Sequence, residues 1–149
     1  MTLRKFVPFL LLLASMNIYS TNLIPLNEFV NKNDLGDAAI LEHIAKRCSA
    51  HNLAMTRWTT EGDGAYELAM TNYIFWYTNA ILFRTIKFPD QDQQIAAKNI
   101  IDSIVNISDE IDNVMKNSQD MRGSIWEGNS FTSDLTLCKV FAEEINNLE

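Results

Sequence analysis

The residues of this sequence best suited to chemistry are its cysteines and histidines. Cys48 and His51 are separated by two residues, which places a thiol and an imidazole on adjacent turns of one helix. Such a pair could form part of a metal site or an activated nucleophile. However, two ligands do not make a zinc site, and no second pair of ligands lies near them in the sequence. We therefore predict no metal site, no bound cofactor and no catalytic residue here.

The two histidines, His43 and His51, are also poorly spaced for joint ligation of a metal. Eight positions along a helix rotate their side chains about 80° apart. We expect each histidine to be a partly exposed residue or a local hydrogen-bond partner.

The two cysteines, Cys48 and Cys138, are the only ones in the chain. In an oxidising compartment an even pair of cysteines predicts a disulfide. The alternative is two separate buried thiols. A disulfide would leave Cys48 no role as a ligand or nucleophile.

The compartment is predicted from the first twenty residues. Arg4 and Lys5 precede an apolar run over residues 6–18, and small residues follow it. This run is about 13 residues long, whereas a membrane-spanning helix needs about 20. We therefore expect residues 1–20 to be a signal peptide, cut after Ser20 or alternatively after Ser15. The mature domain, residues 21–149, is expected in the periplasm or outside the cell, and a eukaryotic secretory route stays open.

The charge of the chain restricts its partners. The formal net charge is −7, and removal of Arg4 and Lys5 with the leader would lower it to −9. An acidic domain repels phosphate backbones and anionic lipids, which excludes general nucleic-acid binding and disfavours membrane association after cleavage. Cationic partners remain open.

The hydrophobic pattern predicts a helical protein with one domain. Nearly half of the residues, 47%, are apolar, which is enough for a sizeable core. Apolar residues recur at helical spacing in four segments, preceded by a short arm over residues 21–33. Predicted N-caps are Asn33 or Asp34, Asp90 with Gln93, and Thr132 or Ser133. The predicted helices cover about residues 34–58, 64–88, 90–118 and 132–148.

The second predicted helix, residues 64–88, is the most apolar part of the mature chain. Its apolar residues surround the helical wheel, which indicates a central helix enclosed by the others. Two alternatives are a strand over residues 73–77 and a transmembrane segment. The absence of a breaker opposes the strand, and interrupting polar residues such as Asn72 and Asn79 oppose the membrane span.

Together these elements predict an all-α, four-helix-bundle-like fold. Cys48 and Cys138 fall on the apolar faces of the first and fourth predicted helices. A disulfide between them requires these helices to be neighbours, with Cα atoms within about 7 Å.

Aromatic residues supply the candidate binding sites. A ligand pocket beside the second predicted helix would be formed by Tyr66, Tyr73, Trp76 and Tyr77, although enclosed aromatics are usually core. Trp58 and Trp126, which flank loops, are candidate anchors for a partner protein. The acidic residues from Asp109 to Asp112 are expected to form a solvated helix face, because the calcium-loop pattern is missing.

Two functions follow from these features. The leading hypothesis is a non-enzymatic binding module of the cell envelope that recognises a protein or another envelope component. The alternative is a small apolar-ligand carrier, or a bundle enzyme with its site beside the aromatic second helix.

Overall fold

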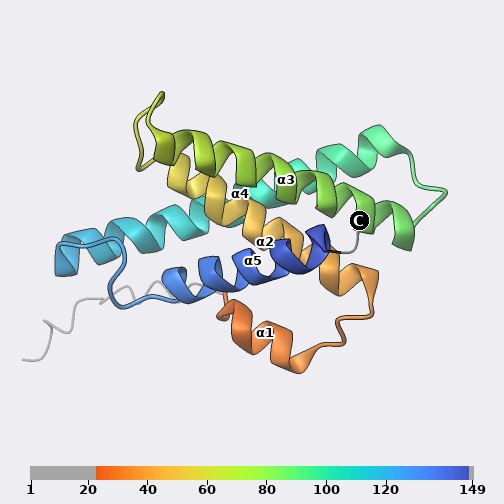
Figure 1. The fold of residues 1–149 in the computed structure, drawn as a ribbon, viewed down its shortest axis with the longest axis horizontal. Coiled ribbons are helices and arrows are strands. Elements are labelled where there is room, and N and C mark those ends of the chain that lie inside the picture. The colour runs from red at the N-terminus through yellow and green to blue at the C-terminus, as the bar shows by residue number, and fades with distance from the viewer. Residues whose placement is uncertain (1–22, 148–149) are drawn as a thin grey trace, which may run out of the picture.

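The structure, a computed structural model, describes residues 23–147. This part of the chain contains five α-helices and no β-strand (Figure 1), which confirms the predicted all-α class. The predicted leader, residues 1–20, lies outside the described residues, as do its two cut sites and the last two residues of the predicted domain. The helices are α1 (Leu26–Lys32), α2 (Ala38–Thr56), α3 (Gly64–Lys87), α4 (Gln93–Arg122) and α5 (Phe131–Asn146).

The ends of α2 and α4 are set by short polar residues and a glycine. Asp37 caps α2, because its Oδ1 accepts the N–H of the residue two positions on at 2.8 Å. Asp92 caps α4 in the same way, so neither Asp34 nor Asp90 is the cap that the sequence suggested. Gly123 follows α4 with a φ of 73°, a left-handed conformation that terminates helices.

The expectation of an irregular arm over residues 21–33 is wrong for its second half, which forms α1. Leu26 begins this helix, is fully buried and joins the core. The ring of Phe29 lies 4.3 Å from that of His43 on α2. A seven-residue helix has little stability of its own, so packing rather than local propensity forms it. The sequence pattern therefore gave no signal for it.

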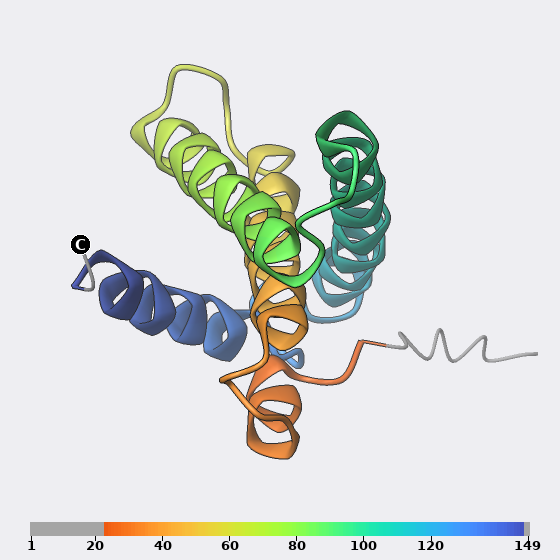
Figure 2. The same cartoon turned by 90° about the vertical axis from the view of Figure 1, so that its right-hand side faces the viewer.

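The central helix is α2 and not the second predicted helix, residues 64–88. Figure 2 shows α2 in the middle, with α3, α4 and α5 around it. Small residues on α2, all fully buried, allow the close approach of its neighbours: Ala45, Cys48, Ser49, Ala50 and Ala54. By contrast, α3 leaves large apolar residues exposed to solvent, including Leu68, Ile74 and Leu82. Thus the apolar character of α3 does not reflect enclosure.

The predicted four-helix-bundle-like arrangement is not confirmed in the described residues. Helix α3 lies along α2 for most of its length. Helix α4 packs against α2 and, less extensively, against α3. Helix α5 contacts α2 and α1, whereas α3 and α5 do not pack closely against each other. In Figure 2, α5 points away from α3 and α4. The arrangement is therefore a three-helix unit of α2, α3 and α4, with α5 attached to it through α2.

The helical spacing of apolar residues predicted for residues 90–118 is confirmed in α4, where these residues form a stripe along one face. Ile100, Ile104, Ile111 and Met115 are buried at helical spacing and face the core. None of the helices within residues 23–147 combines the length and apolar character that a membrane span requires.

Candidate functional site

A disulfide joins Cys48 on α2 to Cys138 on α5, with 5.6 Å between their Cα atoms. These are the segments predicted as the first and fourth helices, so the predicted pairing is confirmed, although the helices are the second and the fifth in the structure. Both cysteines are buried. Because both sulfur atoms are in the bridge, Cys48 cannot act with His51 as a ligand pair or a nucleophile.

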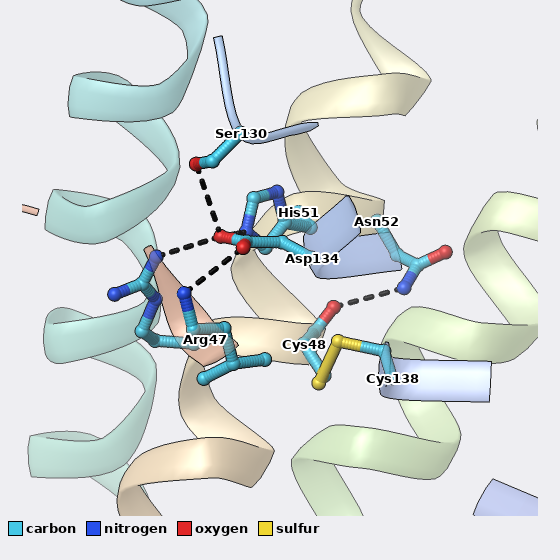
Figure 3. Close-up of a disulfide and its surroundings, with 8 residues drawn as sticks. Arg47, Cys48, His51, Asn52, Ser130, Asp134 and Cys138 are labelled. Atoms are coloured by element: carbon cyan, nitrogen blue, oxygen red, sulfur yellow. Dashed lines mark hydrogen bonds and ion pairs between the residues drawn. A yellow bond between two sulfur atoms is a disulfide. The ribbon is translucent and has the colours of Figure 1, made fainter. Parts of the chain in front are cut away.

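Next to the disulfide lies a buried polar cluster, which consists of Arg47 and His51 on α2 and Asp134 on α5 (Figure 3). One oxygen of the Asp134 carboxylate, Oδ2, accepts a hydrogen bond from Arg47 Nη2 at 2.8 Å. The same oxygen lies 3.1 Å from His51 Nε2. Only 1% of Asp134 and 2% of each partner are exposed, so this is an ion pair in the protein interior. It holds the first turns of α5 against α2.

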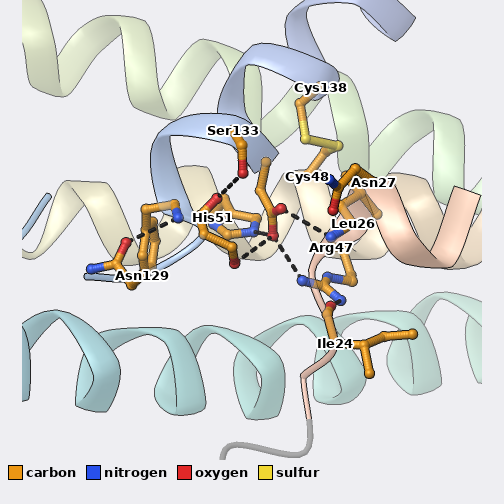
Figure 4. A network of polar contacts seen from close by, with 12 residues as sticks. Ile24, Leu26, Asn27, Arg47, Cys48, His51, Asn129, Ser133 and Cys138 are labelled. Atoms are coloured by element: carbon orange, nitrogen blue, oxygen red, sulfur yellow. Dashed lines mark hydrogen bonds and ion pairs between the residues drawn. A yellow bond between two sulfur atoms is a disulfide. The ribbon is translucent and has the colours of Figure 1, made fainter. Parts of the chain in front are cut away.

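The Arg47–His51–Asp134 cluster also fixes the segment that leads into α1 (Figure 4). The other carboxylate oxygen of Asp134 accepts the backbone N–H of Leu26 at 2.9 Å. The guanidinium of Arg47 donates to the backbone carbonyl of Ile24. The cluster therefore connects three segments that are distant in the sequence.

The pKa values of Asp134 and His51 are both lowered, although burial and hydrogen bonding act in opposite directions on each group. Burial would raise the pKa of Asp134, but hydrogen bonds from His51 and Leu26 and the charge of Arg47 outweigh it and lower the pKa below 3.8. Burial lowers the pKa of His51 below 6.5 despite its bond to Asp134. At neutral pH the imidazole is therefore uncharged and donates its Nε2 proton to the carboxylate.

The polar groups around His51 and Asp134 are few. The remaining nitrogen of His51, Nδ1, is buried and has no hydrogen-bond partner within the described residues. The hydroxyl of Ser130 contacts Asp134 at 3.5 Å and not the imidazole, so no nucleophile is paired with a base. Within residues 23–147, no group of three His, Cys, Asp or Glu side chains is placed to hold a metal ion.

The role of His51 differs from the sequence expectation. It is a hydrogen-bond partner, but its partner lies 83 positions away and the side chain is fully buried. Arg47 and Asp134 were missed altogether. A signal did exist, because Asp134 lies one helical turn before Cys138 and therefore on the same inner face. A charged residue at such a position indicates a buried partner.

A second candidate site is the apolar groove between α3 and α5, referred to below as the α3–α5 groove. It contains two hollows of about 530 Å³ and 430 Å³, and Trp76 lines both of them. The larger hollow lies at the amino-terminal half of α3 and the middle of α5, and the smaller one at the carboxyl-terminal halves of both helices. The larger hollow is lined mainly by Met55, Leu68, Ala69, Asn72, Leu135, Cys138 and Ala142. The smaller is lined mainly by Leu35, Leu41, Ile44, Leu82, Phe83, Phe141 and Ile145.

Of the four residues predicted to form a ligand pocket, Trp76 alone lines the α3–α5 groove. Tyr73 and Tyr77 stack on each other with 6.3 Å between ring centroids and pack against the core. Tyr66 is half-buried and lines neither hollow. The three tyrosines therefore share neither hollow with Trp76.

The two predicted anchors, Trp58 and Trp126, have different surroundings. Trp58 is half-buried, and its Nε1 donates to Asp112 on α4 at 2.8 Å. Trp126 lies in the loop before α5 and is 43% exposed. Asp112 is buried and paired with Lys116 at 2.6 Å, so the expectation of a fully solvated acidic face is wrong at this position.

Comparison of the chain with protein-family models, with curated proteins and with solved structures found no match. The described residues thus form an all-helical, disulfide-linked unit with a buried polar cluster and an apolar groove.

Proposed function

We propose that this protein is an exported, non-enzymatic binding module that holds a segment of a partner protein in the α3–α5 groove. The observation that carries this proposal is the divergence of α5 from α3, which leaves two apolar hollows on either side of Trp76. Large exposed apolar surfaces usually mark interaction sites in soluble proteins.

The side chains of the groove support binding over catalysis. Its lining is aliphatic and aromatic, with the amides of Asn52, Asn72 and Asn79 as the neutral polar groups. Lys139 and Glu144 are the titratable residues that line it, one in each hollow. A general acid and base need to converge on one substrate atom, which this separation does not favour.

The openness of the groove supports a protein partner over a small apolar ligand. Leu68 and Leu82, which line the two hollows, are 62% and 52% exposed. Sites for small molecules bury about 70–90% of the ligand surface. A wall this exposed is better matched to a protein segment that covers it. If the carrier alternative were correct, native mass spectrometry of the protein purified from its source would show a retained lipid or cofactor mass.

Export is part of the proposal and is supported by the leader pattern together with the disulfide, which is typical of oxidising compartments. Intact mass measurement of the protein from the cell envelope tests it. We expect the mass of a chain that starts at residue 16 or 21. An intact precursor in the cytosol would contradict export.

The binding role is tested by comparing two substitutions on α3. Leu82→Glu places a charge in the groove, whereas Ile74→Glu changes an equally exposed residue of the same helix that lines neither hollow. Tagged variants are expressed in the native host, and the proteins retained by each are identified. We expect one partner to be retained by the native chain and by Ile74→Glu and to be lost with Leu82→Glu. Equal retention by all three would refute the role of the groove.

A further inference from the structure

We propose that the groove receives a cationic amphipathic α-helix of the partner, an inference that rests on the binding function proposed above. The guest helix lies along the α3–α5 groove with its apolar face over Trp76, and it places a lysine or arginine beside Glu144. It would complete a four-helix unit with α2, α3 and α5.

The helical form of the guest follows from the walls of the groove. Apart from Leu35, which lies in the loop before α2, the lining residues belong to α2, α3 and α5, whose backbone N–H and C=O groups are largely bonded within each helix. The groove therefore offers no strand edge with which an extended peptide could pair. A guest that enters an apolar groove must satisfy its own backbone hydrogen bonds, because unpaired buried backbone groups are costly. A helix does this.

The length of the groove sets the length of the guest. Leu68 in one hollow and Leu82 in the other lie fourteen positions apart on α3, within a lining that runs from Ala65 to Phe83. Fourteen residues of helix span about 21 Å. A guest of about four turns would reach both hollows, with apolar side chains at i, i+3, i+4 and i+7 entering them on either side of Trp76.

The charge of the guest follows from the acidic host. The chain has a formal net charge of −7, which attracts cationic partners and repels a second copy of itself. Glu144 lines the smaller hollow and makes no ion pair within residues 23–147, whereas Lys139 in the larger hollow lies 3.9 Å from Glu143. Glu144 and Ile145, in the last turn of α5, line the smaller hollow, and the carbonyl groups of a helix's last turn favour cations. This end of the groove is therefore expected to bind the cation of the guest.

Two synthetic peptides of about 15 residues test the inference, one of leucine and lysine and one of leucine and glutamate in the same amphipathic helical pattern. Each is titrated into the purified, disulfide-intact protein by calorimetry, and circular dichroism measures the helix content of the complex. We expect the lysine peptide to bind as a helix and the glutamate peptide not to bind. Leu82→Glu should weaken binding about tenfold, and Ile74→Glu should leave it unchanged.

A matched pair of charge reversals separates a local contact from general attraction. Glu144→Lys and Asp120→Lys change the net charge equally, and Asp120 is an exposed residue of α4. Glu144→Lys should weaken binding of the lysine peptide about fivefold, because attraction at the groove becomes repulsion. Asp120→Lys should change it less than about twofold, because Asp120 lines neither hollow and salt weakens interactions between exposed charges.

Four results would overturn the inference. They are equal binding of both peptides, equal effects of the two charge reversals, a bound peptide without helix, and a dimer of the protein itself that Leu82→Glu dissociates in analytical ultracentrifugation. If neither peptide binds but Leu82→Glu still abolishes retention of the native partner, the helical guest is wrong and the binding function stands. If Leu82→Glu also leaves partner retention unchanged, both fail.

Discussion

Replacement of Asp134 by alanine should lower the free energy of unfolding by about 4 kcal/mol. The carboxylate is 1% exposed and accepts hydrogen bonds from Arg47, His51 and the backbone N–H of Leu26. Its removal leaves the guanidinium of Arg47 buried without a counter-charge, and breaking such a pair costs about 3–5 kcal/mol. The unpaired N–H of Leu26 adds about 1–3 kcal/mol, part of which water entering the vacated space would recover. A loss of this size approaches the whole stability of a marginal domain, about 5 kcal/mol.

Urea unfolding at pH 7, followed by circular dichroism with the disulfide intact, measures this loss as a shift of the midpoint at constant slope. Glu143→Ala is the matched control, because this acid lies on the same helix with a largely exposed side chain. It should change stability by less than about 0.5 kcal/mol. If Asp134→Ala does not fold, Asp134→Asn serves instead, since it keeps the volume and one acceptor oxygen.

A third variant isolates the electrostatic contribution. The double substitution Arg47→Met with Asp134→Leu removes both charges and fills their space with apolar atoms. It should be more stable than Asp134→Ala, because exchange of a buried ion pair for apolar residues is often neutral. The reasoning is refuted if Asp134→Ala lies within about 1 kcal/mol of the native protein, or if the double variant is the less stable of the two.

The remaining predictions concern the disulfide, the groove floor and pH. The double substitution Cys48→Ala with Cys138→Ala should lower stability by about 4–5 kcal/mol in urea, because the bridge closes a loop with a sequence separation of 90; an unchanged midpoint would show that other contacts hold α5. Trp76→Ala should lower the free energy of unfolding by about 3–5 kcal/mol in the same assay, because this buried side chain lines both hollows. A loss below about 1 kcal/mol would mean that neighbouring side chains fill the vacated space. Stability should fall as the pH drops from 6.5 to about 4, because burial lowers the folded-state pKa of His43 to about 4 and that of His51 below 6.5. In this pH range the unfolded chain binds more protons than the folded chain, so acid favours unfolding. Urea midpoints that stay constant over this range would contradict these pKa values. His43→Gln should reduce the dependence of the urea midpoint on pH.

The groove depends on features that no single helix reveals. The apolar residues of α3 predicted a helix over residues 64–88, and the structure has one at Gly64–Lys87. Their distribution around the wheel was read as enclosure, although Leu68 and Leu82 face solvent because α5 diverges. The path of α5 is set by the disulfide and by Asp134, both of which hold its first half. A hydrophobic pattern shows which side chains are apolar, but it does not show which of them another helix will cover.

The sequence by itself determined the helical class, the stripe of α4 and the pairing of Cys48 with Cys138. The helical class and the stripe depend on local periodicity, which can be read from neighbouring positions. The pairing depends on the count of cysteines, because the chain has only two. Only the tertiary structure decided that α2 is central, that Asp134 is paired with Arg47 and His51, and that a groove separates α3 from α5. The partners in these contacts lie tens of residues apart along the chain. Their energies arise from burial and charge pairing, which exist only after the helices have packed.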